Sequence, residues 1–155
     1  MFDDLNSIKV GTLVKGVYLG SQVGAMQFIC ARRSGLDVWF LGTDFTVGTR
    51  MYNTAYSFKG INNDSLNWSG ACACSWTVYL YLKSGVVTVE NCKIPTQGEA
   101  NMINKWIRCN GFPYWTSTAG SNNSAAYQVA EFGEVGGGAT SDTHRGVVPL
   151  AKISL

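Results

Sequence analysis

The sequence predicts a single α+β domain, spanning residues 1–155 and built on antiparallel β-sheets with long irregular loops. Charged residues make up 14% of the chain and glycine outnumbers proline 18 to 3, a balance that suits many tight turns rather than a helical bundle or a disordered chain. Short runs of β-branched and aromatic residues alternate with Gly, Asn and Ser clusters. Only one stretch carries a strong helix signal.

The first 45 residues predict a β-meander. Residues 8–20 mix β-branched residues with glycine, and residues 24–33 form a strand pattern that ends at the basic pair Arg32-Arg33. A third strand is expected over residues 37–43. We expect residues 1–45 to be a meander that could serve for attachment or oligomerisation.

A weak stretch and then a hairpin follow. Residues 43–75 carry scattered aromatic, Asn and Gly residues without a period, which predicts a long irregular loop. Residues 76–82 and 86–90 then form a convincing hairpin pattern, with Ser84-Gly85 at its turn.

The helix signal covers residues of about 97–109. Thr96 and Glu99 have the spacing of a capping box, in which each side chain bonds the backbone N–H of the other residue. Apolar residues follow on one face, and Pro113 cannot continue a helix. We therefore expect one amphipathic helix here.

Three strands are expected after the helix, over residues 114–118, 125–132 and 146–153, separated by loops at 119–124 and 133–144. The core is expected to contain the helix's apolar face and the start of these strands: Ile103, Trp106, Ile107, Trp115, Val147, Val148 and Leu150.

Three motifs carry a resemblance to a known family. Ile94-Pro-Thr-Gln-Gly-Glu99, the run Tyr114-Trp-Thr-Ser-Thr118 and the ending Arg145-Gly-Val-Val-Pro-Leu-Ala-Lys-Ile153 are similar to signatures of C-type-lectin-like domains of the bacterial and phage kind, which are related to the formylglycine-generating-enzyme fold. The resemblance covers roughly residues 85–155 and implies a C-type-lectin-like part over residues 76–155.

Charge and hydropathy exclude some classes of binding partner. The net charge is +2 and the twelve Lys and Arg residues are scattered, so no nucleic-acid partner is expected. No apolar run approaches the roughly 18 residues that span a bilayer, so no membrane insertion is expected. The N-terminus lacks the apolar region of a secretory signal, and we expect synthesis in a cytosol.

Catalytic and metal-binding patterns are weak. His144 is the one histidine, and no Ser or Cys has a recognised nucleophile context, so we expect no enzyme. The five cysteines lack a zinc-site spacing and, being odd in number, suggest free thiols. The calcium-ligand motifs of lectins are missing and the cysteine pair of formylglycine-generating enzymes is not found after Cys109, so we expect no metal and no cofactor.

The remaining expectation is a binding surface on the loops. Asn, Ser, Gly and aromatic side chains, which suit stacking and hydrogen bonding to sugars, gather in residues 43–70, 119–124 and 133–144. The candidate ligand-binding residues are Tyr56, Trp68, Trp115, Asn122, Asn123, Tyr127 and His144.

The function expected from this pattern is a non-enzymatic binding or structural module. The resemblance favours a bacteriophage virion protein of a fibre, tail or decoration, which contacts a host-surface glycan or protein and other virion proteins. Such a protein is expected to be a homo-oligomer, for example a trimer, located in the virion. The alternatives are a sugar- or protein-binding domain of a secreted or surface bacterial protein, and a degenerate formylglycine-type enzyme.

Overall fold

The computed structural model describes residues 3–43, 66–122, 124–142 and 145–155. These residues form two antiparallel sheets and four short helices, so the predicted α+β class is confirmed. No described helix has the length and apolar character needed to cross a membrane.

The larger sheet has six strands in the order β5-β4-β1-β2-β3-β9, and every neighbouring pair is antiparallel. Because β1 pairs with β4 and β3 pairs with β9, the strands of the N-terminal meander share one sheet with the later part of the chain. The bounds are Leu13–Gly20 for β1, Gly24–Ser34 for β2, Asp37–Gly42 for β3, Trp76–Leu82 for β4, Gly85–Cys92 for β5 and Leu150–Ser154 for β9.

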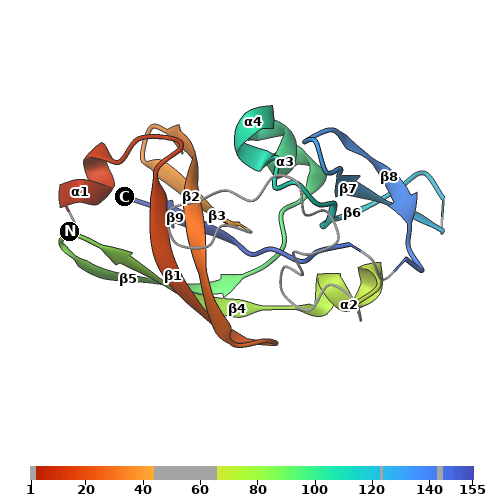
Figure 1. Cartoon of the computed structure of the whole chain (residues 1–155), viewed down its shortest axis with the longest axis horizontal. Coiled ribbons are helices and arrows are strands. Elements are labelled where there is room, and N and C mark those ends of the chain that lie inside the picture. The colour runs from red at the N-terminus through yellow and green to blue at the C-terminus, as the bar shows by residue number, and fades with distance from the viewer. Residues whose placement is uncertain (1–2, 44–65, 123, 143–144) are drawn as a thin grey trace.

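The two edges of this sheet meet at one point. Lys93 and Leu150 form an isolated antiparallel bridge, in which the Leu150 N–H donates to the Lys93 carbonyl at 2.9 Å. The sheet therefore curls towards a barrel, with β5 and β9 joined at this bridge. Figure 1 shows the strands of this sheet crossing one another as it curls.

Two clusters of buried side chains make the core. The first fills the inside of the curled sheet and includes Phe28, Phe40 and Trp76. The second lies on the outer face of β2 and β3, where Trp39 and Leu41 pack against the next part of the chain.

That next part is a smaller layer made of a second sheet and two helices. Strands β6 (Tyr114–Ala119), β7 (Ala125–Val129) and β8 (Val135–Ala139) form an antiparallel sheet in this order. The expected Gly-rich loop at 133–144 thus contains a strand. The expected strand 125–132 ends early, because a turn at residues 130–134 leads into β8.

The predicted helix over about 97–109 is interrupted. It is split into α3 (Gln97–Met102) and α4 (Lys105–Arg108), although the capping box of Thr96 and Glu99 is confirmed. The break occurs because Ile103 takes an extended conformation and the Asn104 side chain accepts from the Trp106 N–H, which starts a new helix.

The break also decides which apolar residues are buried. Ile103 is in the second core and Ile107 packs against it, but Trp106 is 73% exposed, so its predicted core position is wrong. The new helix start at Asn104 places the indole outside. The other predicted core residues are buried: Trp115, Val147, Val148 and Leu150.

Two short helices complete the described fold. Helix α1 (Asp3–Ser7) lies at one end of the curled sheet, at the opposite end of the molecule from the small sheet (Figure 1). Helix α2 (Trp68–Ala73) lies in the expected long loop, and Asn67 caps it by accepting from the Gly70 N–H at 2.9 Å.

Candidate functional site

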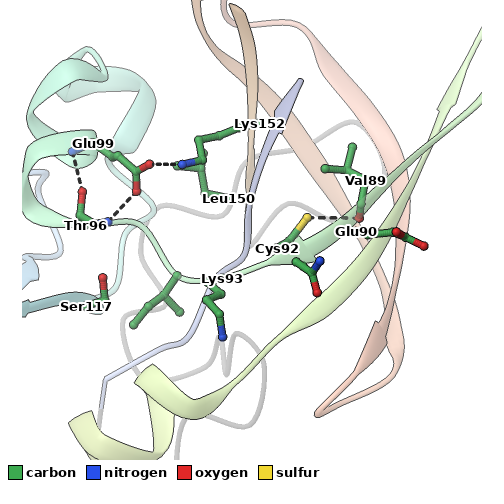
Figure 2. A pocket seen from close by; sticks show the side chains of 11 residues that line it. Val89, Glu90, Cys92, Lys93, Thr96, Glu99, Ser117, Leu150 and Lys152 are labelled. Atoms are coloured by element: carbon green, nitrogen blue, oxygen red, sulfur yellow. Dashed lines mark hydrogen bonds and ion pairs between the residues drawn. The ribbon is translucent and has the colours of Figure 1, made fainter. Parts of the chain in front are cut away.

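A cleft with polar and apolar walls lies where β5 and β9 separate beyond their bridge. Its volume is about 270 Å³, just below the roughly 300 Å³ at which small-molecule sites begin. Figure 2 shows its side chains, which come from β5, the connection to α3, α3 itself, β6 and β9. This β5–β9 cleft is lined by Val89, Glu90, Asn91, Cys92, Lys93, Ile94, Thr96, Glu99, Ser117, Leu150 and Lys152.

A β-bulge shapes the β5 wall of the cleft. Trp76 pairs with Cys92 and Val78 pairs with Val89, so two residues of β5 face one residue of β4. Asn91, within the bulge, has a φ of 56°, a left-handed conformation that Asn tolerates better than most residues. The bulge bends β5 at the cleft.

An ion pair stabilises the opposite wall. The Glu99 carboxylate accepts from the Lys152 ammonium of β9 and, at 2.9 Å, from the Thr96 N–H (Figure 2). Burial alone would raise the pKa of Glu99, but the bonds from Lys152 and Thr96 outweigh it and lower the pKa below its ordinary value. The carboxylate is therefore ionised at neutral pH and links α3 to β9.

Other polar groups in the cleft are uncommitted. Among the described residues, no hydrogen bond or ion pair engages the side chains of Glu90, Asn91 or Lys93, which are exposed, or of Ser117, which is half-buried. These residues place one carboxylate, one amide, one ammonium and one hydroxyl along the walls and rim of the cleft as donors and acceptors. This mixture matches a ligand with several hydroxyl groups, since each hydroxyl both donates and accepts.

The thiol in the cleft is unreactive in character. Burial raises the pKa of Cys92 to about 11, and its Sγ donates to the Val89 carbonyl at 3.3 Å. A thiol in this state is almost wholly protonated at neutral pH and is a poor nucleophile and metal ligand.

The ligand-binding residues expected from the sequence lie elsewhere. Trp115 is fully buried in the first core. Trp68 is half-buried on α2, where its Nε1–H donates to the Thr116 carbonyl at 2.9 Å. Tyr127 is half-buried on β7 and Asn122 is exposed before it.

These four residues lie on or beside the small sheet and do not line the β5–β9 cleft. Tyr56, Asn123 and His144 lie outside the described residues. The proposed role of the loop residues stays a prediction.

The sequence predicted Thr96 and Glu99 only as a helix cap, and the cleft that they line was not predicted. The available signal was Asn91 at the end of a Val-rich strand, because Asn is depleted in strands and tolerates the left-handed conformation of a bulge. The approach of β9 has no local signal, because Leu150 meets Lys93 across 57 positions of sequence.

Within the described ranges, no group of three or more His, Cys, Asp or Glu side chains is placed to hold a metal ion. Comparison of the chain with protein-family models, with curated proteins and with solved structures finds no match.

Proposed function

We propose that this protein is a non-enzymatic binding and structural module of a bacteriophage virion, in a fibre, tail or decoration, and that its β5–β9 cleft binds a host-surface saccharide. The polar groups of Glu90, Asn91, Lys93 and Ser117, which line one small cleft and make no hydrogen bond or ion pair among the described residues, are the observation that carries this proposal. Saccharide sites need such groups because each sugar hydroxyl must exchange its bonds with water for bonds with the protein.

The resemblance to C-type-lectin-like domains supports the same reading. The motif Ile94-Pro-Thr-Gln-Gly-Glu99 forms part of the cleft, with Ile94, Thr96 and Glu99 among its lining residues. The neutral Cys92 thiol also favours binding over thiol chemistry at this site.

Exposed apolar side chains support the proposed homo-oligomer. Met102, Trp106 and Phe132 are 51%, 73% and 65% exposed, and they lie on α3, on α4 and in the turn between β7 and β8. The Arg108 side chain donates to the Gly133 carbonyl at 2.7 Å, so this turn lies beside α4. Large exposed apolar groups of this kind mark interaction surfaces.

The test is an array of bacterial surface glycans probed with the full chain, alongside its mass in solution by light scattering. We expect a defined set of saccharides to be retained and a mass that is a multiple of 16.8 kDa. The alternative of a domain from a secreted or surface protein predicts a monomer that still binds a saccharide.

A matched pair of variants ties the binding to the cleft. Glu90→Gln should weaken binding of the retained saccharide roughly tenfold, the cost of one hydrogen bond to a charged group. Asp37→Asn makes the same chemical change at the start of β3, away from the cleft, and should leave binding unchanged. Equal affinities for the two variants would exclude the cleft, and no retained glycan would overturn the proposed function.

A further inference from the structure

A second hollow lies at the end of the curled sheet near the N-terminus. It has a volume of about 500 Å³, within the roughly 300–1,000 Å³ range of small-molecule sites. Its walls are α1, the start of β1 and the end of β4, at the opposite end of the β4–β5 hairpin from the β5–β9 cleft. This N-terminal groove is lined by Asp4, Ser7, Ile8, Lys9, Thr12, Leu13, Val14, Lys15, Tyr81, Leu82 and Lys83.

Helix α1 is fixed over the groove from both sides. The Asp4 carboxylate accepts from the Lys83 N–H at 2.8 Å and from the Ser84 hydroxyl, which ties the helix to the β4–β5 turn. The Arg33 guanidinium donates to the carbonyls of Leu5, Asn6 and Ile8 at 2.7, 2.8 and 3.1 Å. The groove is thus a preformed site, so a ligand would not have to order its walls.

Three lysine side chains make the groove positively charged. Lys9, Lys15 and Lys83 line it, all three are exposed, and none of them belongs to an ion pair among the side chains that the structure describes. Among the lining residues that the structure describes, Asp4 carries the one carboxylate, and its oxygens accept from the Lys83 N–H and the Ser84 hydroxyl of the turn. Three ammonium groups around one hollow attract and hold an anion.

An aromatic side chain and apolar side chains also line the groove. Lys15 and Tyr81 are directly opposite on β1 and β4, so the ammonium and the ring are on the same outer face. Tyr81 is 49% exposed and can stack on a ring. Ile8 and Leu82 also line the groove and pack against the first core.

We infer that the N-terminal groove binds an anionic saccharide, a sugar ring that carries a phosphate, sulfate or carboxylate group. The ammonium groups receive the anion and the Tyr81 ring receives the apolar face of the sugar. The Thr12 hydroxyl can bond a sugar hydroxyl, and the Ser7 hydroxyl, which donates to the Asp4 carbonyl at 3.3 Å, can still accept from one. This site is separate from the β5–β9 cleft and does not depend on the proposed function.

Calorimetric titration of the full chain with glucose 6-phosphate is the test, with glucose, inorganic phosphate and adenosine monophosphate as comparison ligands. We expect the sugar phosphate to bind at least tenfold more tightly than the other three ligands. Its binding should weaken in high salt, since exposed charges are screened. Tighter binding of inorganic phosphate or of the nucleotide would overturn the saccharide assignment, and no binding of any anion would overturn the site.

Three variants and one matched control locate the ligand. Lys15→Gln and Lys83→Gln should each weaken binding of the sugar phosphate roughly three- to tenfold. Tyr81→Thr should weaken this binding by a similar factor without changing its salt dependence. Lys105→Gln removes the same charge on α4 and should have no effect. Unchanged affinity in all three groove variants would contradict the inference.

Amide chemical shifts in the titration separate this inference from the proposed function. Shifts around residues 81–83 are expected for the groove, and shifts around residues 89–94 would report the cleft. Shifts confined to residues 89–94 on addition of the sugar phosphate would overturn the groove while leaving the cleft intact.

Discussion

The outer face of the six-stranded sheet is covered in one half and open in the other. On β2 and β3, the outward residues Ile29, Trp39 and Leu41 are buried under α3, α4 and the small sheet. On β4 and β5, the outward residues Tyr81 and Val86 are 49% and 45% exposed. The inner face is buried in both halves.

This difference is visible in the burial patterns of the strands. Residues 27–31 and 38–43 are buried without a break, as expected for strands packed on both faces, whereas β4 alternates between buried and more exposed residues. The covered half provides stability and holds one wall of the β5–β9 cleft through α3. The open half keeps a solvent-facing surface beside the N-terminal groove, where a ligand can approach.

The largest effect is expected from Phe112→Ala in the covered half. Phe112 is 1% exposed in the second core, and its ring centroid lies 5.8 Å from that of Tyr114. Its loss leaves a cavity between the two layers, and we expect the free energy of unfolding to fall by about 3–5 kcal/mol in urea denaturation.

Phe132→Ala is the control for this prediction, because it makes the same change at a residue that is 65% exposed. It should cost about 0.5 kcal/mol or less. Similar losses for the two variants would show that the two layers do not share the second core.

A smaller effect is expected from Glu99→Gln, which breaks the ion pair between α3 and β9. The expected loss is about 1 kcal/mol near neutral pH, because solvent screens the half-exposed Lys152 partner and glutamine retains part of the cap. The variant should be compared with the parent chain by urea denaturation at several pH values.

The pH dependence has a definite sign. The folded pKa of Glu99 lies below the ordinary value of 4.5, so its stabilisation is present above pH 4.5 and is lost as the pH falls through the lowered folded value. The difference between parent and Glu99→Gln should shrink over that range. Lys152→Gln should reduce the same pH dependence, and a double-mutant cycle without coupling would contradict the pair.

The smallest effect is expected in the open half, from Tyr81→Thr. Threonine keeps a strand preference, and the Tyr81 ring covers little of the core, so the free energy of unfolding should change by about 0.5 kcal/mol or less. A loss above about 2 kcal/mol would mean that the open face is covered in solution, for instance by another copy of the chain.

Local signals in the sequence were enough for several elements. The capping box at Thr96 and Glu99 and the β4–β5 hairpin depend on residues within a few positions of each other, although the hairpin turn lies at Lys83-Ser84, one residue before the predicted Ser84-Gly85, because Gly85 already pairs with Leu82. The class of fold follows from composition and turn spacing for the same reason. Each of these features has its physical cause within a short piece of chain.

The helix break is a case where a local signal was present but weaker than the apolar pattern. Asn104 is a good helix start, and the tertiary packing of Ile103 in the second core fixed the break there and left Trp106 outside. The apolar pattern alone predicted one continuous helix. The burial of Ile103 in the second core favoured the helix start at Asn104 over the continuous helix that the apolar pattern predicted.

The two candidate sites were decided by tertiary structure. The β5–β9 cleft joins Glu90 to Lys152, and the N-terminal groove joins Lys9 to Lys83, across strand pairings that depend on how the sheet curls. Sequence by itself determined which short segments become strands, turns and caps, because those choices rest on local backbone and side-chain preferences. Only the packed structure decided which of these segments meet, because long-range pairing is set by the burial of both cores together.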